Sequence, residues 1–580
     1  MPGSADAVQR LVHTLEAGWA VAWMRRALAL ALVVGLAVFF LLYEFHGLAT
    51  SQAMDQAQIG REMLHGHLWK TKFARPLALG QLQRHGKNGA AKIWTDTYNA
   101  PLPPLVDAIA LLPVRSHLAA MSRDTIYLGD RMIVLMSTIL FLGSLVPFFL
   151  TARRLFDQQV AFLSCIMVLL GDIFWQYSLS GLPQMLLLLF FNSTLYVLVR
   201  AIEAQAEDKP SFRWLGAAGL GFGLLALSHA LTIWICLAAL VFVILHFRPR
   251  LRAAAWLVAP VLILYTPWLL RNYLVCGNPA GVAFYALFGQ LGASEAGQMR
   301  SLVFDLHSLN AGMLRAKIND NLMEQMGALF RYFGGSVVAL FFFPAILHPF
   351  RHAATASTRW LILALWLGAF CGMVVYGIDE ELGVAANQLH LLFLPIMTSF
   401  GLAFLLVQWN RLGIAGRSPR FGFLTALFVL STWPMISNLT LASPKPIVRW
   451  PPYAPPYIAL INTWMQPNEI IASDMPWAVA WYADRHSVWL PDTLAHLNEL
   501  NDYKALGGPV DALYLTPISG GQNKLSDITK GEYKDWAKVV LRSVDLKTFF
   551  LPWASLLGPE GECVFFSDHD REKAAAGAKP

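Results

Sequence analysis

The chain has 580 residues, of which 56% are hydrophobic and only 14% are charged. Soluble domains carry about 25% charged residues, so this composition excludes an ordinary soluble protein and predicts an integral membrane protein. The formal net charge is +7. We do not expect nucleic-acid binding, because Lys and Arg gather in short loops on one side of the apolar segments, as they do in cytoplasmic loops of membrane proteins.

About eleven apolar segments are long enough to cross a membrane as helices. The first covers residues 27–43 and follows Arg25 and Arg26, so residues 1–26 are expected in the cytoplasm. Basic residues fall in alternate turns between the segments, which places two long loops, 44–125 and 271–327, on the extracytoplasmic side. The other segments lie near residues 126–150, 159–177, 181–199, 212–228, 230–247, 253–270, 328–349, 359–377, 389–408 and 421–440.

The chain changes character after about residue 443. A proline-rich linker, SPKPIVRWPPYAPP, precedes short apolar runs bounded by turn residues, which are EIIASD, HSVWLP, DALYLTP and ECVFFSD. Such runs are typical of β-strands, and helical patterns lie among them. We therefore predict a polytopic α-helical membrane module at 27–442, followed by an extracytoplasmic soluble α/β domain at 443–580.

A polar stretch directly follows the first apolar segment. It reads QAMDQAQIGREMLHG over residues 52–66. In a helix, with about 100° of rotation per residue, Asp55 and Glu62 are seven positions apart and lie on nearly the same face. Two interpretations stay open. The acids face a cavity between helices, as a catalytic carboxylate would, or they belong to a solvated helix at the membrane surface and face water.

Further candidates lie in both predicted outer loops. The sequence DTYNAPLPPLVDAI places Asp96 and Tyr98 just before an amphipathic segment that suits a helix in the membrane interface. The sequence YTPWLLRNYLVCGNP places Arg271 and Asn272 just outside the seventh span. An arginine there can hold a phosphate with two hydrogen bonds, or it can extend toward the lipid headgroups.

Three features of the later chain allow a functional and a structural interpretation. His390 opens the tenth span and could donate to a phosphate, or it is a bystander at the interface. Asp172 lies near the outer end of the third span, where an acid needs a partner or a cavity, unless its carboxylate reaches water. The acidic turn of Asp379, Glu380 and Glu381 could hold a divalent metal, although a solvated turn is favoured. No cofactor is firmly predicted.

Taken in order, these motifs resemble the glycosyltransferases of the GT-C fold that use polyprenyl-phosphate-linked sugars. That group includes the lipid A aminoarabinose transferase, the rhizobial galacturonosyltransferases and the protein O-mannosyltransferases. The resemblance covers most of the chain. It rests on MDQAQIGREMLHG, NAPLPPLVDAI, TPWLLRNYLVCGNP, HLLFLPIM and, in the tail, SDMPWAVAWYADRHSVWLP.

The resemblance implies roles for particular residues. An Asp after the first span acts as the base or organises the acceptor, and that role falls on Asp55. Many relatives carry a second acid immediately after it, but this chain has Gln56. The departure favours Asp55 alone, or Asp55 together with Glu62. A basic position at the start of the tenth span falls on His390.

The expected function is therefore sugar transfer from a polyprenyl-phosphate donor to an envelope glycan, lipid or protein acceptor, on the outer face of a bacterial inner membrane. Asp55 would take the acceptor proton, and a single displacement would invert the anomeric centre. Arg271 and His390 would neutralise the departing phosphate. Candidate site-lining residues are Asp96, Tyr98, Asp172 and Asn272.

Three other functions remain open. A flippase or transporter would be expected to show paired broken spans in two halves, which this sequence lacks. A glycan ligase or polymerase would use a lipid-pyrophosphate donor, and more arginines would be expected in its outer loops. A structural subunit of an envelope-glycan complex is the third. The kind of donor distinguishes these functions.

Overall fold

The computed structural model describes residues 19–577, apart from residues 88–92, 119–125, 290, 292–296, 306, 308, 335–336, 379, 382, 415, 441–454, 522–523, 542, 544–548 and 558–561. The chain up to His46 forms one compact unit, and the chain from Gly47 onward forms another. The first unit holds α2 (Trp19–Phe39), which continues into the π-helical turn η1 (Phe40–Glu44). Its segment Arg26–Glu44 is long and apolar enough to cross a membrane, as predicted.

The second unit contains most of the apolar helices. In the described part of the chain, seven helices are long and apolar enough to span a membrane, and the pair α7 and α8, bent by 56°, makes eight. Three shorter apolar helical segments lie at the remaining predicted membrane spans. The protein is therefore a polytopic α-helical membrane protein. The helices are α6 (Leu128–Leu155), α7 (Gln158–Leu169), α8 (Asp172–Ser178), α9 (Gln184–Ala206), α10 (Phe212–Ser228), α11 (Thr232–His246), α12 (Arg250–Cys276), α13 (Ala311–Gly334), α14 (Val337–Leu340), α15 (Phe342–Ile346), α16 (Ala353–Tyr376), α17 (His390–Arg411) and α18 (Arg417–Thr440).

One predicted segment is not a single helix. In place of the span predicted at 328–349, α13 ends at Gly334 and the short helices α14 and α15 follow. The backbone carbonyl of Val338 in α14 packs directly against Gly401 of α17, a contact that a side chain at position 401 would block. Tertiary packing therefore decides the path here, where apolar composition alone predicts an uninterrupted helix.

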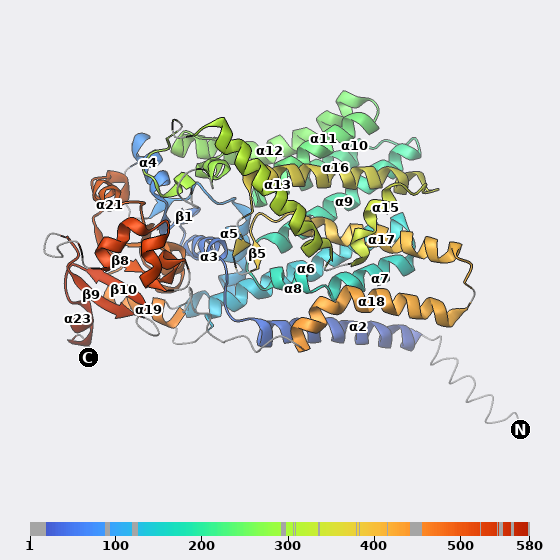
Figure 1. The fold of residues 1–580 in the computed structure, drawn as a ribbon. Coiled ribbons are helices and arrows are strands. Elements are labelled where there is room, and N and C mark those ends of the chain that lie inside the picture. The colour runs from blue at the N-terminus through green and yellow to red at the C-terminus, as the bar shows by residue number, and fades with distance from the viewer. Residues whose placement is uncertain are drawn as a thin grey trace, which may run out of the picture. The chain divides into compact units, whose positions relative to one another are not determined.

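Several helices of the second unit pack in neighbouring pairs (Figure 1). Helix α10 lies between α9 and α12, and α11 packs against both α12 and α16. Helix α17 is the most buried of the long helices and contacts α7, α9 and α14. Its central position explains why its first residue, His390, is enclosed by protein.

The first loop folds into short elements that the site uses. They are α3 (Ser51–Leu64), β1 (Lys70–Thr71), β2 (Phe73–Ala74), α4 (Pro76–Arg84), β3 (Trp94–Thr95) and α5 (Leu102–Leu111). Strands β1 and β3 pair with each other, whereas β2 joins a sheet of the tail. The second loop contributes the 3-10 turns η3 (Val282–Phe288) and η4 (Gly297–Arg300), and the turn before α17 forms the hairpin β4 (Glu380–Glu381) and β5 (Val384–Ala385).

The tail forms the predicted α/β region around a six-stranded sheet of order β2-β7-β6-β8-β10-β9. Strands β2, β7, β6 and β8 run parallel, and β10 is antiparallel to both of its neighbours. Its elements are α19 (Pro455–Trp464), β6 (Ile470–Ser473), α20 (Pro476–Ala478), the π-helical turn η5 (Val479–Ala483), β7 (His486–Trp489), α21 (Leu494–Asn501), β8 (Val510–Leu515), α22 (Ala537–Val540), β9 (Trp553–Leu557), β10 (Cys563–Ser567) and α23 (Arg571–Gly577), with 3-10 turns at Lys504–Leu506, Pro517–Gly520, Leu525–Lys530 and Lys534–Trp536. The four apolar runs predicted as strands become β6, β7, β8 and β10.

The sheet crosses from the tail into the first loop. Phe73 and Ala74 pair with Ser487 and Val488 of β7, so the first loop supplies an edge strand of the tail sheet. Helix α4, blue in Figure 1, lies beside the tail, and the side chain of Gln83 accepts a hydrogen bond from a tail backbone N–H at 2.9 Å. The first loop and the tail therefore share one packed core, and the domain boundaries at 442 and 443 stay a prediction.

Candidate functional site

Helix α3 is buried along most of its length although its sequence is polar. It begins after Thr50, whose hydroxyl accepts a hydrogen bond from the N–H of Ala53 at 3.3 Å. Asp55 and Glu62 are each only 1% exposed, so the interpretation as a solvated surface helix is wrong. Because buried polar groups need partners, the packing around α3 must supply donors for both acids.

The acidic turn before α17 fixes the start of α3. The backbone N–H and the hydroxyl of Ser51 donate to the two carboxylate oxygens of Glu381 at 2.5 and 2.6 Å. Such an acid at a helix N-terminus also compensates the helix dipole. Glu380 pairs with Arg331 at 2.7 Å, and Asp379 lies outside the described residues. Among the residues that the structure describes, no group of three or more acidic, His or Cys side chains is placed to hold a metal.

Asp55 accepts hydrogen bonds on both carboxylate oxygens. Oδ2 receives the guanidinium of Arg75 and the side-chain amide of Asn99, each at 2.8 Å, and Oδ1 receives the amide of Gln58 at 3.1 Å. Gln58 is itself oriented by the hydroxyl of Thr71 at 2.6 Å. These donors hold the carboxylate in one orientation, with lone pairs of Oδ1 still available to accept a proton.

Asp96 lies next to Asp55 but is held differently. Its carboxylate accepts the backbone N–H groups of Tyr98 and Asn99 at 3.2 and 3.0 Å. The side-chain amide of Asn99, which contacts Asp55, is also 3.4 Å from Asp96 Oδ1 and so bridges the two acids. Burial and the nearby charge of Asp55 raise the pKa of Asp96 to about 6, although neighbouring guanidinium groups oppose the rise. Burial and the neighbouring charge therefore let Asp96 exchange a proton closer to neutral pH than an ordinary carboxyl does.

Two arginines bring positive charge to this pair. The guanidinium of Arg75 lies 3.7 Å from the ring centre of Tyr98 and 4.3 Å from that of Phe73. Such stacking fixes the plane of the guanidinium while it pairs with Asp55. Arg75 was not among the residues predicted from the sequence.

Arg271 reaches the same place from the end of α12. Its Nη1 donates to the backbone carbonyl of Asp96 at 2.5 Å and to the side chain of Asn272 at 2.7 Å. Among the described residues, the hydrogen bond of its Nη2 is a long one of 3.5 Å, to the carbonyl of Trp69. Arg271 therefore points into the protein, as the phosphate-binding interpretation requires, and Nη2 keeps donor capacity for a ligand.

We name these residues the Asp55 cluster: Asp55, Arg75, Asp96, Tyr98, Asn99, Arg271 and Asn272. A pocket with about 280 Å³ of empty space lies along it, between β1, β2, β3 and α4. Thr71, Arg75, Asp96 and Tyr98 form its polar end, and Leu79, Leu82 and Trp94 are among the apolar side chains of its wall. The arrangement can hold an anionic group beside a carboxyl that takes up a proton.

Glu62 belongs to a different group of charges. Its carboxylate pairs with Lys72 at 2.9 Å and accepts from His67 at 3.1 Å. Burial alone would raise the pKa of Glu62, but Lys72, His67 and Arg61 together lower it. The two acids predicted to act together are thus neutralised by separate partners.

His390 and Asp172 lie in other surroundings. Fully buried, His390 accepts a hydrogen bond from the Trp366 indole at 3.2 Å and packs against the aromatic rings of Tyr332, Phe333 and Phe370. Asp172 starts α8 and accepts the amides of Gln176 and Asn438 at 2.5 and 2.6 Å, which ties α8 to α18. No hydrogen bond or ion pair between described residues joins either of them to the Asp55 cluster.

Sequence reasoning missed three partners of Asp55, which are Gln58, Arg75 and Asn99. Asn99 lies inside the motif NAPLPPLVDAI, and Gln58 lies in QAMDQAQIGREMLHG. Both motifs were recognised from the sequence, but neither residue was assigned a role. Arg75 lies outside the quoted motifs, and residues 44–125 contain other arginines, so the sequence offers no signal that singles it out.

Comparison with known proteins supports the architecture. The family model described as Dolichyl-phosphate-mannose-protein mannosyltransferase matches residues 113–270. No curated protein sequence matches the chain.

Solved structures of the archaeal oligosaccharyltransferase AglB from Archaeoglobus fulgidus share the fold. One, in complex with an inhibitory peptide and a dolichol-phosphate, is 12% identical, with a TM-score of 0.52 over 94% of this chain and 75% of that one. Another, with Zn and sulfate, is 12% identical, with a TM-score of 0.51 over 87% of this chain and 69% of that one. ArnT from Cupriavidus metallidurans is 12% identical, with a TM-score of 0.40 over 97% and 99% of the two chains. The chain is a multi-pass membrane protein with the GT-C fold of these structures, and residues 113–270 match a family model named for a mannosyltransferase.

Proposed function

We propose that this protein transfers a sugar from a polyprenyl-phosphate-linked donor to an envelope glycan, lipid or protein, on the extracytoplasmic face of a bacterial inner membrane. One observation carries the proposal: Arg75 and Asp96 line a pocket in the first loop, and Asp55 and Arg271 contact these two residues directly. The matching family is named for a dolichyl-phosphate-linked sugar, and AglB has been solved with dolichol-phosphate. Both names support a lipid-phosphate donor.

The chemistry needs one base and one site for negative charge. The acceptor hydroxyl attacks the anomeric carbon, the new bond to that carbon forms, and the bond from the carbon to the phosphate oxygen breaks. Asp55 takes the hydroxyl proton, and the lipid phosphate leaves with the bonding electrons. Asp96, whose pKa is raised to about 6, lies beside Asp55, and the Asn99 amide donates to both carboxylates and holds them in place. One displacement inverts the anomeric centre.

The guanidinium groups suit the departing phosphate. Arg271 offers Nη2, whose present contact is only 3.5 Å long, and Arg75 lines the pocket directly. Charge-assisted hydrogen bonds of this kind stabilise the negative charge that grows on the leaving group. The aromatic surroundings of His390 make Arg75 a better second phosphate ligand than that histidine.

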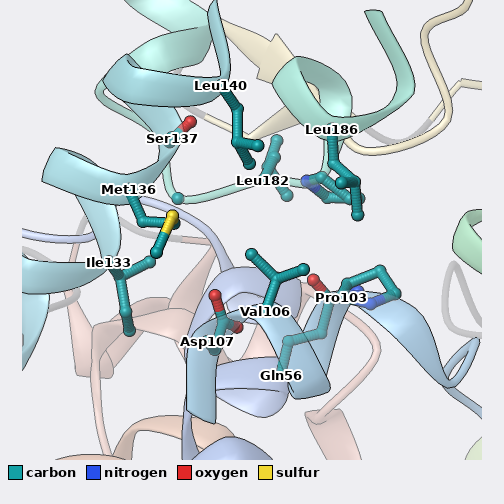
Figure 2. Close-up of a pocket in the computed structure, with 12 residues that line it drawn as sticks. Gln56, Pro103, Val106, Asp107, Ile133, Met136, Ser137, Leu140, Leu182 and Leu186 are labelled. Carbon is teal, nitrogen blue, oxygen red and sulfur yellow. The ribbon is translucent and has the colours of Figure 1, made fainter. Parts of the chain in front are cut away.

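A second pocket offers apolar surface for the lipid part of the donor (Figure 2). It has about 320 Å³ of empty space, and Figure 2 shows Met136 and Leu140 of α6 facing Val106 of α5 across it. Gln56 lines this pocket on the side of α3. Gln56 stands where the resemblance implies a second acid. Because it faces a mostly apolar pocket, an uncharged glutamine suits this position. Asp55 would then act as the base without an acid next to it in the sequence.

The test is complementation of a deletion strain with wild type, Asp55→Asn, or Glu203→Gln as the control. Glu203 pairs with Arg154 at 2.9 Å, far along the sequence from the cluster, so its loss removes an acid and an ion pair without touching the pocket. Mass spectrometry of envelope glycans, glycolipids and glycoproteins is compared at equal membrane levels. We expect one product to disappear on deletion, to return with wild type and Glu203→Gln, and to stay absent with Asp55→Asn.

A second arm identifies the donor. The purified protein in lipid nanodiscs receives either a synthetic polyprenyl-phosphate sugar or a lipid-pyrophosphate oligosaccharide. Transfer only from the pyrophosphate would replace the proposal with a glycan ligase. Full activity of Asp55→Asn would show that the base is another residue, and a deletion that changes no glycan would refute the enzyme itself.

A further inference from the structure

The C-terminal half of α3 is held by a short piece of the tail. Arg61, only 2% exposed, donates to the backbone carbonyls of Trp481 and Ala480 at 2.8 and 2.6 Å. The same guanidinium pairs with Asp484 at 2.7 Å and lies 5.0 Å from the ring centre of Trp481. One arginine of the catalytic helix thus makes all of these contacts with residues 480–484, which we name the tail segment.

The tail segment is shaped to receive this arginine. Residues Val479–Ala483 form a π-helical turn, and Asp484 follows in the left-handed region with a φ of 53°. A π-helical turn shifts the backbone hydrogen bonds away from the usual pattern, and here two carbonyls point to Arg61. Left-handed backbone is uncommon for a residue with a side chain, although Asp tolerates it better than most, and the side chain of Asp484 is fixed here by two ion pairs.

The contact between Arg61 and the tail segment is part of a chain of ion pairs. Asp484 also pairs with Lys72 at 2.7 Å, and Lys72 pairs with Glu62 at 2.9 Å. Two cations and two anions, which we name the Arg61 network, therefore join α3, the first loop and the tail. The tail segment is further held by Asp130 of α6, which accepts the Trp481 indole at 2.7 Å and the Tyr482 hydroxyl at 2.9 Å.

This network is connected to Asp55 by two hydrogen bonds. The backbone N–H of Lys72 donates to the side-chain carbonyl of Gln58 at 3.0 Å, and the amide of Gln58 donates to Asp55 at 3.1 Å. Arg75 lies three residues beyond Lys72, directly after β2. Any shift of Lys72 relative to α3 therefore moves two of the groups that hold the Asp55 carboxylate.

We propose that the tail completes the catalytic centre, with Arg61 as a positioning residue whose contacts with the tail segment hold α3 and the first loop in the register that orients Asp55. The inference rests on the proposed function for its kinetic test. Its structural part, the dependence of α3 on the tail segment, stands independently of which reaction is catalysed.

The full-length protein provides a matched control. Arg300 of the second loop is also fully buried in the tail, where it donates to the carbonyls of Leu490 and Pro491 at 2.8 and 3.2 Å. Among the described residues, its hydrogen bonds and ion pairs are with tail residues, so Arg300→Met loosens the tail without releasing α3. The test variants are Arg61→Met, the conservative Arg61→Lys, and Asp484→Asn, which serves as the milder variant if Arg61→Met does not fold.

Two readouts are made on the purified protein in nanodiscs. Hydrogen exchange of the α3 amides should increase in Arg61→Met and Asp484→Asn, and stay at the wild-type level in Arg300→Met. With the synthetic polyprenyl-phosphate sugar as donor, kcat should fall about a hundredfold in Arg61→Met, because misplacement of a catalytic group by about 1 Å has an effect of this size. KM for the donor should change less than threefold, and Arg61→Lys should recover part of kcat.

The outcomes separate the two proposals. Absence of transfer by the wild type would refute the proposed function, while the exchange experiment would still test the dependence of α3 on the tail. Unchanged α3 exchange, or an equal loss of kcat in Arg61→Met and Arg300→Met, would overturn the positioning role. A loss confined to KM would do the same, because it would show a role in donor binding instead.

Discussion

Helix α3 takes part in two buried groups of charged residues. The two groups have the same number of acids and cations, but their acids differ in their partners and in their pKa values. The Arg61 network and the Asp55 cluster each contain two carboxylates and two cations. In the network, both carboxylates touch a cation directly, and the pKa values of Glu62 and Asp484 are lowered in spite of burial. In the cluster, Asp96 meets only N–H groups of the backbone and of Asn99, and its pKa rises to about 6.

The difference shows how a structural ion network is distinguished from a reactive site. In the Arg61 network each carboxylate lies directly against a cation, which favours its charged form. Asp96, held by N–H groups beside another acid, keeps a proton affinity nearer to neutral pH. Arg75 and Asp96 of the Asp55 cluster also line a pocket.

The largest effect is expected when the cluster loses one charge. In Arg75→Gln the buried carboxylate of Asp55 has no ion-pair partner, which typically costs about 3–5 kcal/mol of folding free energy. The double variant Asp55→Asn with Arg75→Gln removes both charges, so we expect it to regain most of that stability and to remain inactive. Thermal unfolding in detergent and sugar transfer measure the two properties separately. A double variant no more stable than Arg75→Gln would contradict the ion pair.

The pH dependence of stability should have opposite signs in the two sets. The folded-state pKa of Asp96 is raised, so its contribution to stability is present below about pH 4 and is lost as the pH rises through about 6. Asp96→Asn should therefore improve relative to wild type as the pH rises from 4 to 7, by roughly 3 kcal/mol for a shift of about two pKa units. The measurement is the unfolding midpoint of both proteins across this range.

The substitution Glu62→Gln tests the pH dependence of stability in the Arg61 network. The pKa of Glu62 is lowered, so its contribution is present above its unfolded pKa and is lost as the pH falls through the folded value. The variant should be most destabilised at neutral pH and should approach wild type below about pH 4.5. If both variants changed in the same direction with pH, the distinction between network and cluster would be refuted.

A smaller effect is expected where α3 meets α5, between the two sets of charges. A Cβ at Gly60 would lie 2.9 Å from the backbone N of Ala108 and from the carbonyl O of Pro104. Gly60→Ala should push the helices apart and cost about 1–3 kcal/mol, with loss of transfer because both sets move. Gly143→Ala in α6, which has no atom within 4 Å of the new Cβ, should leave unfolding and transfer near wild type.

The sequence predicted the parts of the site more successfully than their assembly. Asp55, Asp96, Tyr98, Arg271 and Asn272 were identified from motifs, and the structure brings them together. Helical periodicity shows which acids share a face of α3. It carries no information on which loop packs against that face, so the separate partners of Asp55 and Glu62 could not be foreseen.

The apolar segments show the same limit. Composition located each of them, because burial in lipid demands long apolar stretches. Beside the break in the segment predicted at 328–349, the carbonyl of Val338 packs against Gly401, a residue more than fifty positions later whose missing side chain admits it. The positions of His390 and Asp172 away from the cluster depend in the same way on how helices pack, which single-segment patterns do not contain.

The smallest effect is expected at Asp107, another buried acid near α3. Burial raises the pKa of Asp107 well above the usual range, and its Oδ2 has no hydrogen-bond partner in the described structure. Burial therefore favours the protonated, uncharged form of this acid, in contrast to the paired Glu62. Asp107→Asn keeps the shape of the side chain, so we expect a change in unfolding free energy of less than about 1 kcal/mol and unchanged transfer. A large loss of transfer at constant stability would move the proton chemistry from the Asp55 cluster to the pocket of Figure 2.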